Sequence, residues 1–146
     1  AMDGRTLEID DVCVSWHHAP GRFTARLVTP SPGWLAFGVN DRPALAGTRF
    51  VMADMSMPDI RVSERVALVP GHVPIDSLDL APALLGASGS FRRGRSSLEV
   101  RLRPSIDTRP RMRLRSGSRV HLMLAWSRET DFAHHSAWRR HVPVEL

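Results

Sequence analysis

Short stretches of this 146-residue chain alternate apolar with polar residues, and no stretch keeps the 3.6-residue period of an amphipathic helix. Residues 22–29 show the alternation clearly, with Phe23, Ala25 and Leu27 on one face of an extended strand and arginine or threonine on the other. Turn signals rich in Gly, Pro and Asp recur about every 8–12 residues. The pattern predicts an all-β fold, an immunoglobulin-like antiparallel β-sandwich of about eight to nine strands.

The length of the chain suffices to bury a core without disulfides, and no linker or internal repeat divides it, so we expect residues 1–146 to form a single domain. The single cysteine, Cys13, excludes an internal disulfide and a multi-cysteine metal site, and its place between Val12 and Val14 predicts a buried apolar thiol. No apolar run approaches the roughly 20 residues of a membrane helix, so no membrane span is expected. No secretory leader is recognisable in the sequence as it stands.

The positive charge of the chain is carried by twenty arginines, because lysine is absent. Half of the arginines lie between residues 92 and 119, where they alternate with apolar residues such as Leu102, Met112 and Leu114. This period of two predicts solvated strand faces whose opposite faces are core. The same arginines could instead attract an acidic protein partner. Nucleic acid is not expected, since no aromatic residue is interleaved with the arginines and no nucleic-acid motif accompanies them.

The stretch of residues 33–57 is apolar on both faces of its first predicted strand. Alternation places Trp34, Ala36 and Gly38 on one face, and Leu35, Phe37 and Val39 on the other. A strand of this kind must be covered on both sides, by a second sheet and by something else. We expect an apolar slot between the two stacked sheets, beside the strand that contains Trp34.

No catalytic constellation is recognisable in the sequence. There is no Gly-x-Ser-x-Gly elbow, no His-Glu-x-x-His and no glycine loop that would cradle a phosphate. Asp10 and Asp11 are adjacent on a predicted strand, so their carboxylates should point apart rather than form an acid/base pair. We therefore expect a binding or electron-transfer module and not an enzyme.

The order of several short motifs resembles the DOMON family over about residues 6–141. A Gly-Trp-x-x-x-Gly strand is followed by a Leu-Ala-Gly turn and an apolar strand, and an aliphatic-Ala-Trp strand near the C-terminus is followed by Asp-x-x-x-His and an arginine. These features stand here at Gly33, Trp34, Gly38, residues 45–47, residues 50–53, residues 124–126, Asp131, His135 and Arg139.

The resemblance implies an immunoglobulin-like β-sandwich outside the cytoplasm, periplasmic or secreted, that binds b-type haem or a sugar-like ligand. In haem-binding members of the family a methionine and a histidine are the axial ligands, and the domain exchanges single electrons with a partner enzyme. His135 falls on the histidine position, with His134 as its neighbour. The methionine position falls at Ala44 and Leu45, which carry no sulfur.

The haem hypothesis assigns named residues to a pocket. Haem iron accepts an imidazole nitrogen or a thioether sulfur. We predict His135 as one axial ligand of the iron and Met52 as a replacement for the missing methionine, with Trp34 and Phe37 lining the pocket. His134 and His135 on one extended segment would point to opposite faces, so at most one of them should enter the pocket.

Other sulfur and imidazole groups leave alternatives open. Met52, Met55 and Met57 follow the family's methionine position, and they are also suited to filling gaps in the core or to binding Cu(I). His17 and His18 precede an Ala-Pro-Gly turn signal, so we expect them to be exposed in a turn.

Two functions follow from these observations. The first is an extracytoplasmic module that binds haem b and transfers electrons, with the arginine-rich strands steering it toward an acidic redox partner. The second is a haem-free module that binds a sugar-like small ligand, or another protein, through the same pocket or an exposed sheet face.

Overall fold

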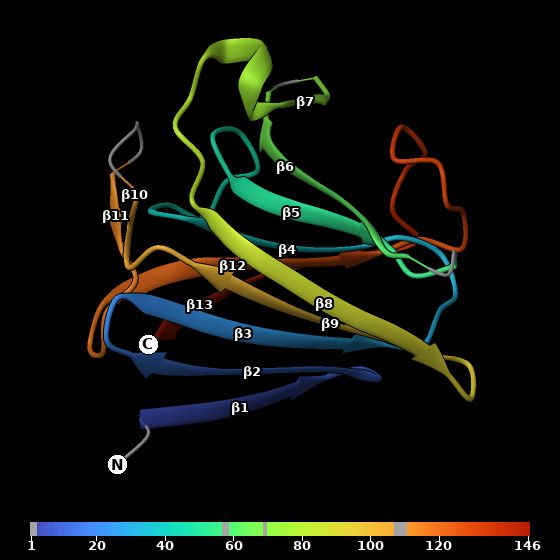
Figure 1. Ribbon diagram of the computed structural model, residues 1–146, viewed down its shortest axis with the longest axis horizontal. Helices are drawn as coiled ribbons and strands as arrows, with labels where there is room; N and C mark the ends of the chain where they lie inside the picture. The colour runs from blue at the N-terminus through green and yellow to red at the C-terminus, as the bar shows by residue number, and fades with distance from the viewer. Residues whose placement is uncertain (1–2, 57–58, 69, 107–110) are drawn as a thin grey trace.

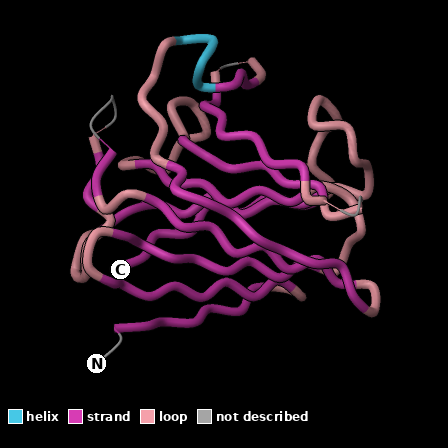
Figure 2. Tube along the Cα trace, in the orientation of Figure 1, coloured by secondary structure: helices cyan, strands magenta, loops and turns pink. Residues whose placement is uncertain are grey.

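Two antiparallel sheets stack face to face in the computed structural model, which describes residues 3–56, 59–68, 70–106 and 111–146 (Figures 1 and 2). The five-stranded sheet has the order β1 (Asp3–Ile9), β2 (Val12–Ala19), β3 (Arg22–Thr29), β9 (Arg95–Leu102) and β8 (Leu84–Arg92). The six-stranded sheet has the order β13 (Trp138–Glu145), β12 (Arg119–Trp126), β4 (Leu35–Asn40), β5 (Arg49–Asp54), β6 (Arg61–Ala67) and β7 (His72–Pro74).

The remaining elements are short. Strands β10 (Ser105–Ile106) and β11 (Met112–Arg113) form a two-stranded ribbon, and η1 (Ile75–Leu78) is a single 3₁₀ turn. Within the described ranges there is no α-helix, and thus no helix long and apolar enough to cross a membrane. The predicted all-β antiparallel sandwich is confirmed.

The predicted number of strands is too low, because the described residues form thirteen. Two hairpins with two-residue turns account for part of the difference, β1–β2 at Asp10-Asp11 and β8–β9 at Arg93-Gly94. Asp10, Arg93 and Gly94 adopt positive φ angles of 49°, 53° and 78°, which fit the backbone twist of tight hairpins. Neither dipeptide is the Asn-Gly signal that marks such turns. The polar tail also forms a strand, β13, which was not predicted.

The inward faces of the two sheets together form one apolar core. Phe23, Ala25 and Leu27 are at most 1 % exposed, as the alternation in residues 22–29 predicts. The rings of Phe23 and Phe37 stack across the interface with their centroids 6.5 Å apart. The hollow beside Phe37 measures only about 10 Å³, the space of roughly one water molecule. The expected slot between the sheets is therefore filled by the chain's own side chains.

A buried ion pair joins the six-stranded sheet to the segment that leads into β8. Arg49 Nη2 lies 2.8 Å from Glu64 Oε2, with the two side chains only 2 % and 9 % exposed. Glu64 also accepts hydrogen bonds from the backbone N–H groups of Ala83 and Leu84, and Arg49 Nη2 donates to the carbonyl of Ala81. These bonds fix the crossing from one sheet to the other.

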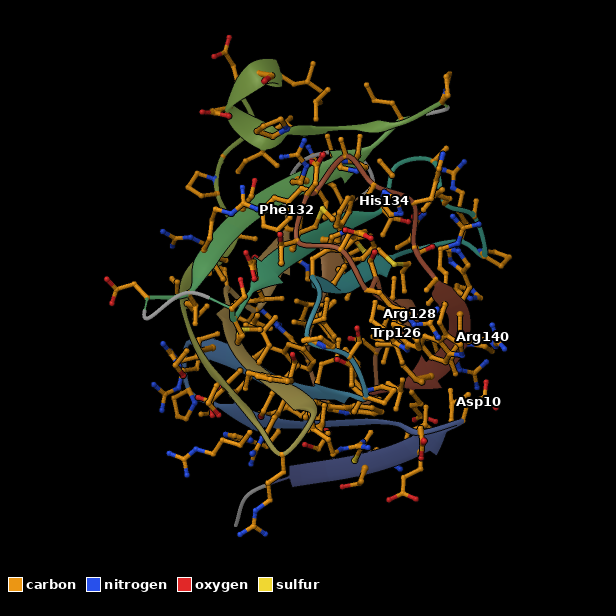
Figure 3. All side chains as sticks on the ribbon, turned by 90° about the vertical axis from the view of Figure 1, so that its right-hand side faces the viewer. Asp10, Trp126, Arg128, Phe132, His134 and Arg140 are labelled. Atoms are coloured by element: carbon orange, nitrogen blue, oxygen red, sulfur yellow. The ribbon has the colours of Figure 1, made fainter. Side chains whose placement is uncertain are left out.

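The acidic residues of the first turn also have a structural role. Asp10 Oδ2 accepts hydrogen bonds of 3.0 Å from Trp138 Nε1 and from Arg140 Nη2. Asp10 and Arg140 are labelled in Figure 3. The interpretation that Asp10 and Asp11 lie on one strand is wrong, because they form the turn between β1 and β2. The turn is thereby tied to β13 of the other sheet.

Three predictions about side-chain exposure have different outcomes. The arginines of β9 and β11 lie on solvated faces, with Leu102 and Met112 buried behind them, and Arg119 is exposed at the start of β12. The rest of that face of β12 is buried, at Met123 and Ala125; Arg109 lies outside the described residues. Cys13 is only half-buried, because Val12 and Val14 take the core face of β2. His17 and His18 lie within β2 and are half-buried rather than exposed in a turn.

Candidate ligand pocket

A pocket of about 480 Å³ lies on the outer face of the six-stranded sheet, away from the core between the sheets. Its floor is made by apolar side chains. Along each strand, these side chains alternate with residues of the core between the sheets. They are Trp34, Ala36, Phe50, Met52, Ala67, Met123 and Ala125. This outer face of β4 is the one for which the sequence predicts a second cover.

The loop of residues 127–137, between β12 and β13, forms one wall of the pocket and carries Phe132 and His134 (Figure 3). Phe132 is 9 % exposed and joins the apolar cluster of the floor. The Arg61 guanidinium lies 4.1 Å from the centroid of the Phe132 ring, and Arg61 Nη2 donates a 2.7 Å hydrogen bond to the Thr130 carbonyl. The loop is therefore held against β6.

Gly33 allows this loop to approach Trp34, the residue before β4. A Cβ atom at Gly33 would lie 1.9 Å from the Ser127 carbonyl oxygen, so no other residue fits without a backbone shift. The backbone N–H of Trp34 donates to the Glu129 carbonyl, and the Trp34 carbonyl accepts from the N–H of Ser127, both at 2.9 Å. The glycine before Trp34 thus has a steric reason.

The loop between β4 and β5 forms the opposite rim. Asn40 Nδ2 donates to the carbonyls of Ala44 and Ala46 at 2.7 and 3.1 Å, and Thr48 Oγ1 donates to the Ala44 carbonyl at 3.0 Å. These bonds place Leu45, which is half-buried, in the lining of the pocket. The position that carries methionine in the resembling family therefore does reach the pocket, where it presents an aliphatic side chain.

A hydrogen-bonded pair from the β6–β7 hairpin forms a third wall. Arg65 Nε donates a 2.7 Å bond to His72 Nδ1. Burial lowers the pKa of His72, the positive charge of Arg65 lowers that pKa further, and a backbone hydrogen bond to Phe132 opposes both effects. Since Nδ1 accepts a hydrogen bond, His72 is a neutral imidazole with its proton on Nε2. Because Nδ1 is already engaged by Arg65, His72 is a poor metal ligand.

His134 and His135 are both exposed residues that line the pocket. Their segment is turned rather than extended, so the alternation that was expected to separate the two side chains does not apply. The Asp131 carboxylate accepts the N–H of Ala133 at 2.9 Å, and the Asp131 carbonyl accepts the N–H of His134 at 3.0 Å. The turn lets both residues line the same pocket.

Of the other predicted residues, Trp34 and Met52 line the pocket, at 4 % and 1 % exposure. Phe37 does not, because it lies on the opposite face of β4 and packs in the core against Phe23; that part of the prediction is wrong. Met55 also packs in the core, so it does not converge with Met52 on a copper site, and Met57 lies outside the described residues. Among the described ranges, no three His, Cys, Asp or Glu side chains group as metal ligands.

Met123, Arg65 and His72 also line this pocket and are not among the predicted site residues. Met123 alternates with the core residues Leu122 and Leu124 on β12. The sequence therefore shows that Met123 lies on the outer face of the strand, but not what covers that face. Arg65 and His72 meet only because β6 pairs with β7, and the sequence holds no motif for that pairing. The resemblance did place Arg139 after the histidine, and it lines the pocket.

The indole N–H of Trp34 supplies a further observation about this site. Trp34 Nε1 is buried and has no hydrogen-bond partner among the described residues. Buried donors in native proteins nearly always have a partner. Trp16 Nε1 and Trp126 Nε1 are in the same state without lining the pocket, so the Trp34 donor does not by itself indicate a bound molecule.

No protein-family model matches the chain, and no characterised protein matches it by sequence. Among solved structures, the chain is similar to the cytochrome domain of Myriococcum thermophilum cellobiose dehydrogenase, with a TM-score of 0.61 and 11 % sequence identity. The match covers 99 % of this chain and 82 % of that one. The chain has the fold of that cytochrome domain. The resemblance to the DOMON family is thereby confirmed at the level of the fold.

Proposed function

We propose that this chain is a non-catalytic, extracytoplasmic module that binds b-type haem in the outer-face pocket and passes single electrons to a redox partner. The observation that supports it best is the convergence of His134 and His135 on an apolar pocket, in a fold shared with a cytochrome domain. The pocket volume of about 480 Å³ lies in the usual range for small-molecule sites, roughly 300–1,000 Å³.

The donor set of the pocket suits haem. His135 is the first candidate for the axial imidazole and His134 its rival, while Met52 supplies a thioether from the floor. Haem, when bound, supplies one-electron chemistry at a potential that the axial ligands set. The apolar floor would pack against the macrocycle. Leu45 cannot ligate iron.

Haem titration of the purified protein, followed by visible absorption, tests this proposal. We expect a Soret band in the wild type that is lost or shifted in His135→Ala or, if the neighbouring imidazole ligates, in His134→Ala. The control is His17→Ala on β2 of the other sheet, which should keep the band. A wild type that leaves the absorption spectrum of free haem unchanged contradicts the proposal.

The exposed arginines of β9, β11 and β12 support a further part of the proposal, an encounter with an acidic redox partner. Surface charges of this kind act mainly on the association rate, and salt screens them over a distance of about 8 Å at physiological ionic strength. Electron transfer to such a partner should therefore slow as salt is added.

Leu45 favours a second candidate function, a haem-free module that binds a sugar-like small molecule in the same pocket. An aliphatic residue at the position of a ligating methionine removes one iron ligand and leaves the pocket intact. A thermal-shift screen of sugars tests it. A ligand at a hundredfold excess over its Kd should stabilise the fold by about 2.7 kcal/mol.

A further inference from the structure

Arg65 is a half-buried cation in the pocket wall that has no acidic partner in the part of the chain that the structure describes. Its Nε donates to His72 Nδ1, and its Nη1 donates to Ser63 Oγ at 3.2 Å. Both acceptors are neutral. The ion pairs among the described residues do not include Arg65, and no Asp or Glu of the described ranges lines the pocket.

A charge in this situation is destabilised by its surroundings. Removing a guanidinium from water costs free energy unless a counter-charge is supplied, and burial accordingly lowers the pKa of Arg65. Arg49, on the adjacent strand, shows the usual solution, since it pairs with Glu64 at 2.8 Å. The wall of the pocket therefore lacks one negative charge that a bound molecule can bring.

The guanidinium is held in place before any ligand arrives. The bond to His72 fixes the Nε edge, and the His72 ring contacts the Phe50 ring edge-on with a centroid distance of 5.4 Å. Arg65 Nη2 makes no hydrogen bond to any described residue, so both N–H bonds of that nitrogen are left for an incoming acceptor. A hydrogen bond from a guanidinium to a carboxylate is about twice as strong as a neutral one.

We infer that Arg65, positioned by His72, is an anion-binding subsite of the outer-face pocket and takes a carboxylate at the edge of a flat apolar ligand. This inference rests on the proposed use of the pocket as a ligand site and adds the chemistry at its β6–β7 end. If the ligand is haem, the carboxylate is one of its propionates. If the pocket takes a haem-free ligand, that ligand carries a carboxylate, as an aromatic acid or an acidic sugar does.

The test compares acids with their esters on the same protein. Wild type, Arg65→Gln and Arg65→Lys are titrated with haem and with haem dimethyl ester, whose propionates carry no charge, and binding is followed by tryptophan fluorescence and visible absorption. Arg128→Gln is the matched control, because Arg128 is exposed, stacks 5.5 Å from the Trp126 ring and does not line the pocket. Arg65→Gln should weaken haem binding roughly 10- to 100-fold and leave the affinity for the ester unchanged.

The outcomes separate this inference from the haem proposal. Equal haem affinity in wild type and Arg65→Gln overturns the subsite and leaves haem binding standing. If haem does not bind the wild type, the haem proposal fails, and 2-naphthoate with its methyl ester becomes the probe in a thermal-shift assay. Stabilisation by the acid alone, lost in Arg65→Gln, supports the subsite; no difference between acid and ester overturns it. If Arg65→Gln does not fold, a wild type that binds acid and ester equally overturns it, and a preference for the acid that weakens in Arg65→Lys supports it.

Discussion

Arg65 Nε donates a 2.7 Å hydrogen bond to His72 Nδ1, and this bond holds the histidine in its neutral form. Protonation of His72 would replace the acceptor by a second donor facing a cation. Because burial and the Arg65 charge lower the folded-state pKa, the unfolded chain binds the proton first as the pH falls. The contribution of His72 to stability is therefore complete above the ordinary histidine pKa of about 6.5 and is lost below it.

We predict that the melting temperature falls as the pH is lowered from 7.5 to 5, and that His72→Gln reduces this dependence. His141 will leave a residual slope, since burial, Arg139 and His121 lower its pKa in the same sense. Differential scanning calorimetry over this pH range measures both slopes. An identical pH dependence in wild type and His72→Gln would contradict the assigned role of the bond.

The fit of Gly33 against Ser127 predicts a large effect of a small substitution. Gly33→Ala places a methyl group at 1.9 Å from a carbonyl oxygen, and overpacking of this kind costs about 1–3 kcal/mol or more. Gly86→Ala is the control, because its new methyl would meet only the mobile end of Arg101, at 2.9 Å. Urea unfolding compares the two. Equal stability of both variants would show that the loop does not depend on this approach.

The Arg49–Glu64 pair predicts a contrast between buried and exposed ion pairs. Glu64→Gln leaves a buried guanidinium without its counter-charge, and breaking such a pair costs about 3–5 kcal/mol. Asp41→Asn breaks the ion pair between Asp41 and Arg42, whose side chains are 41 % and 67 % exposed, respectively. This change should cost less than about 1 kcal/mol. Chemical denaturation of the two variants gives both values, and a Glu64→Gln variant as stable as Asp41→Asn would refute the contrast.

Leu45 predicts a gain of function. Leu45→Met restores a thioether at a position that the Asn40 and Thr48 hydrogen bonds hold in the pocket. In haem-loaded protein we expect a higher reduction potential, because a Met/His pair raises it. Spectroelectrochemistry measures the change, with Leu78→Met on exposed η1 as the control. An unchanged potential and spectrum would mean that residue 45 does not approach the iron.

Local periodicity predicted the class of fold and much of the core. The alternation of Phe23, Ala25 and Leu27 identified a core face, and the doubly apolar β4 implied a cover beyond the second sheet. The same alternation separates Trp34 from Phe37, so placing both in one pocket contradicted the pattern itself. The predicted number of strands was too low, because a tight turn such as Arg93-Gly94 does not interrupt the apolar pattern of the sequence.

The pocket itself depends on contacts that local sequence does not encode. Arg61 and Phe132 meet from β6 and from a loop some seventy residues later, and Arg65 meets His72 through a short edge strand. The turn at Asp131 redirects His134 and His135 after alternation had assigned them to opposite faces. Long-range packing decides these positions, and a single sequence carries no signal for it.

Retention of haem by the purified protein tests the central claim most directly. The apo protein is mixed with excess haem, desalted, and its absorption at the Soret band is compared with its protein concentration. The account predicts about one haem per chain in the wild type and a marked loss in a His134→Ala, His135→Ala double variant that remains folded. Haem that elutes entirely in the small-molecule fraction, or that is retained equally by the double variant, would contradict it.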